Sequence, residues 1–284
     1  MVKAFSVASW NIEHFGGRLS RRNTDQISGF IAQHDADVIA LYEVESSEIF
    51  WPLVNALPGY QYFITEGEQA QEILVGVKKG MTSFVTQKLE FKSGQSTLRP
   101  GMLVTLLIDQ TFFPILFLHL KSMRDPKGFG LRHDMLRRAY QFREVLDAAA
   151  RHNSPPPETG APPPRANYLF AGDFNTMGLD YYPRTVHDIS SADEIAELHR
   201  FAKYKDMRVL SKNAPATFWN GSGSSIPAAD LDHVVAADHL QFKDFNGSEV
   251  DVRGWPQEIG VAKQDEWITQ YSDHALLYFE VQMP

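Results

Sequence analysis

Short apolar runs recur along the whole chain and limit its fold more than any other feature. Each run is five to nine residues long and rich in β-branched and aromatic residues, as in DVIALY at residues 37–42. Runs of this length and composition are typical of β-strands. The predicted strands cover residues 4–10, 37–42, 60–64, 73–77, 102–108, 113–120, 167–172, 231–236 and 274–282.

Helical patterns lie between some of these runs. Residues 131–151 carry one apolar stripe at helical spacing, formed by Met135, Ala139, Phe142, Leu146 and Ala149. Weaker helical patterns cover residues 22–34, 45–57 and 191–203. Many strands with interspersed helices, some strands following one another directly, predict an α/β sandwich with mixed sheets.

A proline-rich segment, SPPPETGAPPPR at residues 154–165, interrupts the pattern. Six prolines in twelve residues exclude a helix or a central strand, so we predict a surface loop. It could also be a linker between domains. Apolar runs of the same character lie on both sides of it, which favours a loop within a single domain spanning residues 1–284.

The composition excludes several classes of protein. Hydrophobic residues make up 43% of the 284 residues and aromatic residues 12%, which is enough for a sizeable core and excludes global disorder. No apolar stretch approaches the roughly 18 residues of a membrane helix, and MVKAFSVASW predicts a first strand rather than a signal peptide. We expect a cytoplasmic protein without membrane contact, although a secreted protein that has lost its leader would look the same. The absence of cysteine excludes disulfides, thiolate metal sites and a cysteine nucleophile.

The charge is negative overall but uneven. A net charge of −8 disfavours a purely electrostatic nucleic-acid binder. Residues 117–143, however, hold seven Lys and Arg against two Asp, a local net charge of +5. A basic patch beside an acidic centre would suit a metal enzyme that acts on a polyanion. The alternative is that these side chains line the solvated face of a helix.

Polar residues follow most of the predicted strands. After the run at 167–172 come Asp173 and Asn175, which point to the same side of an extended chain because they are two residues apart. Each such residue alone could be a turn signal or a structural histidine. Together they indicate a site at the strand ends, where carboxylates without cysteine suit Mg²⁺ or Mn²⁺. The other members are Asn11, Glu13, Glu43, His119, Asp232, Asp273 and His274.

The segments SWNIE, LYEV, HLKS, GDFNT, TFW, LDHVV and SDHALL resemble, in order and approximate spacing, those of the endonuclease/exonuclease/phosphatase superfamily. The resemblance extends over residues 5–280 and is closest to the pancreatic deoxyribonuclease branch. It implies a four-layer α/β/β/α sandwich with two central mixed β-sheets, whose two halves contribute to one cleft.

The resemblance implies a metal shell. Glu43 matches the principal metal-binding glutamate of the superfamily, and Asn11 and Asp273 match positions that complete or support the shell. A shell with few carboxylates and several waters suits Mg²⁺. Mn²⁺ is the alternative, and Ca²⁺ could serve as a structural or second ion.

The resemblance also implies catalytic roles. Asp173 and Asn175 match the pair that orients the attacking water, with Asp173 as the base. His274 matches the histidine that contacts the scissile phosphate, and Asp232 matches the carboxylate that hydrogen-bonds that histidine. His119 matches a histidine of the deoxyribonuclease and sphingomyelinase branches that serves as acid to the leaving oxygen.

Several residues are candidates for binding substrate. Lys121, on the same side of its strand as His119, could hold a phosphate or be merely exposed. Thr217 could donate to phosphate and Trp219 could stack on a base, or both could belong to the core. Arg99 is a candidate for a backbone-phosphate contact. Asp230, where many relatives have arginine, adds negative charge near the site or points to solvent.

The sequence therefore predicts a divalent-metal-dependent phosphodiesterase, a nuclease that cuts DNA rather than RNA by in-line attack of water. We expect a monomer without an obligate protein partner. The alternative is a hydrolase of small phosphoesters, such as inositol phosphates or a sphingomyelin-like lipid. A non-catalytic binding module with the same fold is a third alternative, and it would be expected to have lost some of these polar residues.

Overall fold

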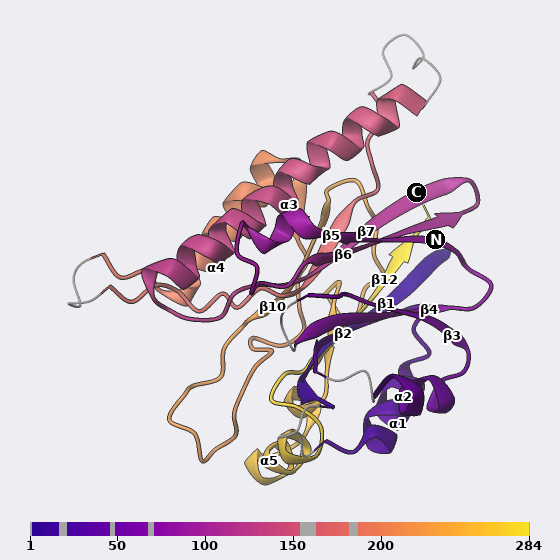
Figure 1. Ribbon diagram of the computed structural model, residues 1–284. Helices are drawn as coiled ribbons and strands as arrows, with labels where there is room; N and C mark the ends of the chain where they lie inside the picture. The colour runs from indigo at the N-terminus through magenta and orange to yellow at the C-terminus, as the bar shows by residue number, and fades with distance from the viewer. Residues whose placement is uncertain are drawn as a thin grey trace.

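A computed structural model describes residues 2–16, 22–45, 49–67, 71–153, 163–181 and 187–283. Two mixed sheets of six strands each lie between two groups of helices, so the predicted sandwich is confirmed (Figure 1). In sheet order, the first consists of β11 (Asp251–Arg253), β12 (Leu276–Gln282), β1 (Lys3–Phe15), β2 (Val38–Val44), β4 (Glu72–Lys78) and β3 (Tyr60–Ile64). The second consists of β5 (Thr82–Lys88), β6 (Gly101–Ile108), β7 (Thr111–His119), β8 (Leu169–Asp173), β10 (Asp232–Ala237) and β9 (Met207–Val209).

Helices cover the outer face of each sheet. Figure 1 shows α3 and α4 on the side of the second sheet, and α1, α2 and α5 on the side of the first. Within the described ranges, none of them is long and apolar enough to cross a membrane. The helices are α1 (Thr24–His34), α2 (Phe50–Ala56), α3 (Pro126–Asn153), α4 (Ser191–Tyr204) and α5 (Val261–Gln270).

All nine predicted strands and all four predicted helices are present, within a few residues of the expected bounds. The sequence patterns did not predict β5, β9, β11 or α5. β5 is exposed or half-buried at every position, β9 and β11 have only three residues each, and only two residues of α5 are buried, so none carries a strong apolar pattern. Residues 154–162 of the predicted proline-rich loop lie outside the described residues, and residues 163–168 have no regular structure.

Each sheet contains one parallel pair at its centre. β1 runs parallel to β2, and β7 runs parallel to β8, whereas every other pairing is antiparallel. Strands of a parallel pair end at the same edge of their sheet. The chain therefore brings four strand ends to one edge of the sandwich.

The central strands of the second sheet are buried on both faces. Along β7, Ile115 and Phe117 belong to the core between the sheets, while Leu116 and Leu118 belong to the core under α3 and α4. This alternation follows the two-residue period of a strand. It explains why the sequence of β7 is an almost continuous apolar run.

Asp37, which directly precedes β2, links this strand to the start of β1 by hydrogen bonds. Its Oδ2 accepts hydrogen bonds from the Ser6 amide and hydroxyl, both at 2.9 Å, and from Nζ of Lys3 at 2.8 Å. Burial alone would raise the pKa of Asp37, but the hydrogen bonds from Lys3 and Ser6 outweigh it and hold the pKa below its usual value.

Asp37→Asn should lower the free energy of unfolding by about 1–3 kcal/mol at pH 7, because the charged acceptor of three hydrogen bonds is lost. A lowered pKa in the folded state stabilises the fold above the unfolded pKa of about 3.9, and this contribution is lost as the pH falls through the folded pKa. The difference between wild type and variant should therefore shrink below about pH 4. Urea denaturation at several pH values measures it.

Asp35→Asn is the matched control. Asp35 is 83% exposed and its ion pair with Lys78 lies at the surface, so this variant should leave stability almost unchanged. Equal effects of the two substitutions would contradict the role given to Asp37.

Candidate active site

The two parallel pairs deliver four polar side chains to one place. Asn11 lies where the pairing of β1 with β2 becomes irregular, and Glu43 is the last residue but one of β2. His119 and Asp173 are the last residues of β7 and β8 and lie opposite each other. The structure therefore brings together residues that lie up to 162 positions apart in the sequence.

Asn11 joins the two sheets at this edge. Its Nδ2 donates to Oδ2 of Asp173 at 3.0 Å and to Oε1 of Glu43 at 3.2 Å. Nε2 of His119 lies 3.5 Å from the same Asp173 oxygen and 3.7 Å from the same Glu43 oxygen. Asn11, His119 and Asp173 are at most 3% exposed, so these side chains form a compact buried cluster.

Left-handed backbone conformations shape the cluster. Glu43 has φ 60° and Asn175 has φ 51°, which are uncommon for residues other than glycine. At Gly172 φ is 145°, and a Cβ atom there would lie 1.9 Å from the carbonyl oxygen of Leu118 on β7. Glycine thus allows β8 to approach β7 closely just before Asp173.

The neighbouring antiparallel strands add two more residues. β10 begins at Asp232, which lies opposite Asp173, and His274 lies two residues before β12. Nδ1 of His274 hydrogen-bonds to Oδ2 of Asp232 at 2.8 Å, and its Nε2 lies 3.8 Å from Asp173. The ring of Phe218 packs 5.0 Å from the imidazole, which restricts its orientation.

The buried charges shift one another's pKa values. Burial raises the pKa of Asp173 to about 7, against the opposing charge of His274. Burial also lowers the pKa of His119 well below its usual value, so this imidazole is neutral. For His274, the carboxylates of Asp232 and Asp173 outweigh burial and hold the pKa well above its usual value. The site thus combines a neutral and a charged histidine around one carboxylate whose pKa is near neutrality.

Among the described residues, two sets of side chains could hold a metal ion. Glu43, His119 and Asp173 form one set, and Asp173, Asp232 and His274 form the other, each with ligand atoms within 4.8 Å of one another. The first set fits a divalent cation better, because its histidine is neutral, whereas His274 of the second set is charged. Asn11 was predicted to complete the metal shell, but its Nδ2 donates to the carboxylates and its Oδ1 accepts from the Glu13 amide. Asp273 lies in the cavity wall, outside both sets.

A cavity of about 970 Å³ opens over the cluster. Its polar lining comes from the ends of β1 and β2 and from the segments before β4 and β6, and it includes Glu13, His14, Gln71 and Arg99. Its apolar lining comes from the segment after β8, the start of α4 and the loop before β10, and it includes Met177, Ile195, Phe218, Ile226 and Pro227. The site is therefore an open cleft with chemically different parts.

The predicted substrate-binding residues occupy different places. Arg99 lines the cavity and is held by the Gln71 carbonyl at 2.9 Å. Thr217 is fully buried and accepts from the amide of Asp232 at 3.0 Å, and Trp219 packs against Trp255 at 5.6 Å. Lys121, Thr217 and Trp219 are outside the cavity lining among the described residues.

Two residues beside Glu43 were missed by the sequence reading. The backbone amide of His14 and Nε2 of Gln71 each donate to Oε2 of Glu43 at 3.1 Å. His14 reaches the site because the end of β1 is irregular, and Gln71 because β4 pairs with β2. No motif or regular spacing in the sequence places His14 or Gln71 next to Glu43.

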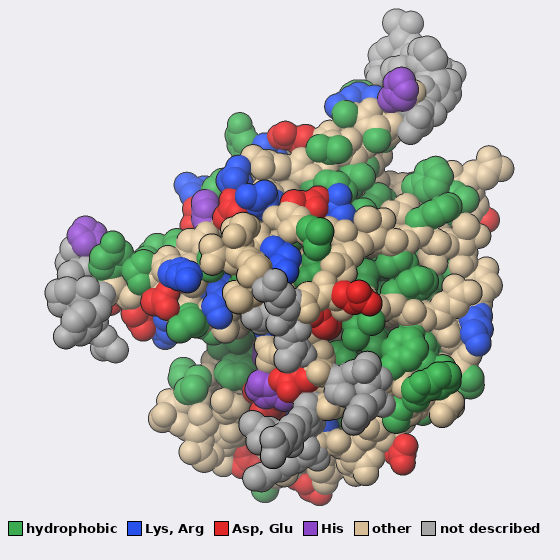
Figure 2. All heavy atoms as spheres, viewed as in Figure 1, with side chains coloured by type: hydrophobic (Ala, Val, Ile, Leu, Met, Phe, Trp, Pro, Cys, Tyr) green, Lys and Arg blue, Asp and Glu red, His purple; other side chains and the backbone are tan. Residues whose placement is uncertain are grey.

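All five arginines of the basic stretch form ion pairs within the molecule. Figure 2 shows blue side chains over the α3 and α4 side with red ones interspersed. Asp230 is likewise offset by an ion pair with Lys212. The pairs of the stretch are Arg124–Asp180, Arg132–Glu194, Arg137–Asp134, Arg138–Asp134 and Arg143–Asp147.

Comparison with known proteins identifies the family. The family model described as "Endonuclease/Exonuclease/phosphatase family" matches residues 8–274. The chain belongs to this family. It is therefore a phosphoester hydrolase, and enzymes of the family use divalent metals.

Solved structures share the fold at low sequence identity. TDP2 of D. rerio in complex with single-strand DNA product is 16% identical, with a TM-score of 0.61 and coverage of 98% of this chain and 99% of that one. A mannosyl-6-phosphatase of Bacteroides thetaiotaomicron is 16% identical, with a TM-score of 0.60 and coverage of 98% and 100%. A family protein of Bacteroides vulgatus is 12% identical, with a TM-score of 0.63 and coverage of 99% of both chains. No curated protein sequence matches the chain.

Glu43→Gln should weaken Mn²⁺ binding by at least about tenfold in calorimetry, because a charged oxygen ligand of the cluster is lost. Glu45→Gln is the control, since Glu45 bonds to His14 and belongs to neither metal set. Unchanged binding in Glu43→Gln, or an equal loss in Glu45→Gln, would contradict a metal site at Glu43.

Proposed function

We propose that the protein hydrolyses phosphodiesters of DNA by in-line attack of water, with a divalent metal bound at Glu43 and with Asp173 free to act as the base. The observation that carries the proposal is the convergence of Asp173, His119 and His274 under one open cleft. A DNA product is bound in the similarly folded D. rerio TDP2, which supports DNA as the first substrate class.

Asp173 takes the proton of the attacking water in this mechanism. A pKa of about 7 suits a base that acts near neutral pH. The backbone amide of Asn175 donates to Oδ1 of Asp173 at 2.9 Å and fixes the orientation of the carboxylate. The metal, when bound, would neutralise a phosphate oxygen and the departing alkoxide.

The two histidines have different tasks. His274 is charged and held by Asp232, so it can donate to a phosphate oxygen whose negative charge grows in the transition state. His119 is neutral, and a neutral imidazole carries one N–H that can donate a hydrogen bond to the leaving oxygen, whose charge a bound metal would also stabilise. Asp273 supports the metal shell from the cavity wall.

Hydrolysis of a small phosphoester is the second candidate. The arginines that would bind a DNA backbone are largely engaged with acidic side chains of the protein, and two of them, Arg132 and Arg143, are buried. Of the described residues that line the cavity, only Arg99 and Arg124 carry a permanent positive charge. The similarly folded mannosyl-6-phosphatase supports this candidate.

Asp173→Asn should lower kcat by about 10²–10⁴-fold on whichever substrate the wild type cleaves, because the base is lost. The panel contains plasmid, single-stranded DNA, RNA, sphingomyelin and sugar and inositol phosphates, each with Mg²⁺ and with Mn²⁺. Asp238→Asn, at the opposite end of β10, is the control and should retain activity. A wild type that leaves DNA uncut but cleaves a small ester would refute the DNA proposal.

Salt dependence separates the two candidates further. Neutralisation of several phosphates makes DNA binding fall steeply with salt, by about 10³–10⁵ between 50 and 200 mM for 6–10 contacts. We expect a much shallower fall of kcat/KM here, because few cationic side chains line the cleft in the described part of the chain. A steep fall would indicate that a basic surface outside the cleft binds the DNA.

A further inference from the structure

One arginine of the basic stretch is fully buried. Arg132 of α3 is 0% exposed, and its partner Glu194 on α4 is 6% exposed. Nε and Nη2 of Arg132 donate to the two carboxylate oxygens of Glu194 at 2.9 and 3.1 Å. This two-point geometry fixes both side chains relative to each other.

The same pair holds two loops. Nη1 of Arg132 donates to the carbonyl oxygens of Met123 at 2.6 Å and Lys121 at 3.3 Å, in the segment after β7. Its Nη2 donates to the Gly178 carbonyl at 2.8 Å, in the segment after β8. Glu194 in turn accepts from the Gly178 amide at 2.7 Å. The pair thus bonds directly to both segments that follow the central parallel strands.

Both segments lead into the cleft. Ser122, between the two carbonyls that Arg132 holds, lines the cavity, and so do Asn175 and Met177 just before Gly178. Asn175 also donates to the Leu120 carbonyl at 3.2 Å, which links the two segments. A shift of either segment would therefore move Asn175 relative to Asp173.

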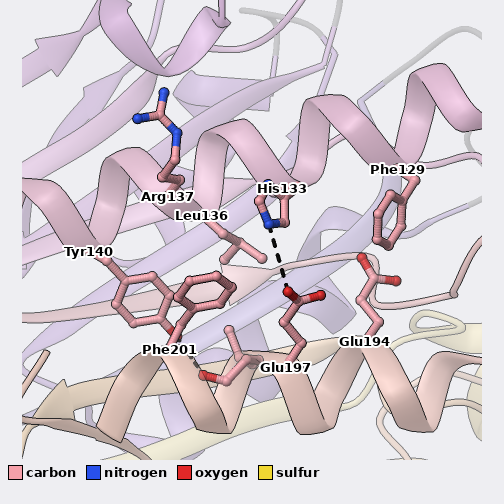
Figure 3. Close-up of a pocket in the computed structure, with 9 residues that line it drawn as sticks. Phe129, His133, Leu136, Arg137, Tyr140, Glu194, Glu197 and Phe201 are labelled. Carbon is pink, nitrogen blue, oxygen red and sulfur yellow. Dashed lines mark hydrogen bonds and ion pairs between the residues drawn. The ribbon is translucent and has the colours of Figure 1, made fainter. Parts of the chain in front are cut away.

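The seam between α3 and α4 has little room for a ligand. Figure 3 shows Glu194 pointing from α4 toward α3 beside Phe129, with the ion pair of His133 and Glu197 next to it. The pocket there measures about 30 Å³, which is room for about two waters. Arg132 and Glu194 in this seam therefore bind groups of the protein itself.

We propose that Arg132 and Glu194 are positioning residues for catalysis, which hold the segments after β7 and β8 at the spacing that the reaction requires. The inference rests on the proposed phosphoester hydrolysis at Asp173. Well-packed apolar residues often replace a buried ion pair without loss of stability, so stability alone does not account for this pair.

A matched pair on the same helix supplies the control. Arg143 is 2% exposed and its Nε donates to Asp147 at 2.9 Å, one turn along α3. Asp147 accepts from the Ala166 amide at 2.7 Å, at the end of β8 remote from the cleft. Arg143 is nearly as buried as Arg132, although Asp147 is 16% exposed, and the pair bonds to no described residue of the cavity lining.

The test compares R132M/E194L with R143M/D147L, because removing both charges avoids leaving one buried and unpaired. We expect kcat of R132M/E194L to fall by about 10–100-fold, since a misplacement of about 1 Å has that effect. Mn²⁺ affinity, measured by calorimetry, should stay within about twofold, because no cluster ligand is touched. R143M/D147L should keep kcat within about twofold at a similar change in melting temperature.

Hydrogen exchange gives a readout independent of turnover. The backbone amides of Leu179 and Asp180 donate to the carbonyls of Ile189 and Arg124. These two amides should exchange faster in R132M/E194L than in the wild type, and at the wild-type rate in R143M/D147L. If the wild type cleaves no phosphoester, the proposed function fails, while this exchange still tests the pair. Wild-type kcat in R132M/E194L, equal losses of kcat in both variants, or unchanged exchange of the two amides would overturn the positioning role. If R132M/E194L fails to fold, E194Q takes its place under the same criteria.

Discussion

The hydrogen bond from Asn11 to Asp173 is the contact on which the site depends. It joins the two sheets at the point where their central parallel pairs end, and the same amide also reaches Glu43. Parallel pairing brings two strand ends together within each sheet, and stacking of the sheets brings the two pairs of ends face to face. The cluster is thus a consequence of the sheet order, and no single loop creates it.

This arrangement concentrates negative charge where water is scarce. Asp173 is almost fully buried, and this burial together with the charges of Asp232 and Glu43 raises its pKa to about 7. The Asn11 amide and the His274 imidazolium offset part of this cost, since buried carboxylates need donors or opposite charge. A divalent cation would offset the rest. The same repulsion that destabilises the cluster without a cation therefore gives it affinity for one.

The sequence revealed those parts of the fold and site that depend on local patterns. The strand runs are visible because most central strands are buried on both faces, and the polar residues at their ends are visible because they interrupt these runs. His14 and Gln71 escaped notice because an irregular strand end and an antiparallel neighbour bring them to Glu43. Arg132 looked like a solvated helix residue, since its buried partner Glu194 lies 62 positions away. Contacts between residues that are far apart in the chain leave no spacing pattern in the sequence.

The charge count of residues 117–143 gives the clearest example of this limit. The stretch has a net charge of +5 as a sequence, but Asp147, Asp180 and Glu194, all from outside it, pair with three of its arginines. An arginine paired with a nearby carboxylate produces only a weak electrostatic potential in the solvent. Long-range attraction of a polyanion by this side of the molecule is therefore weak. Discrimination among phosphoesters then depends on contacts inside the cleft. There, Phe218 packs beside His274 and Ile226 lines the cleft from the loop before β10, and the group attached to the phosphate has to fit against them.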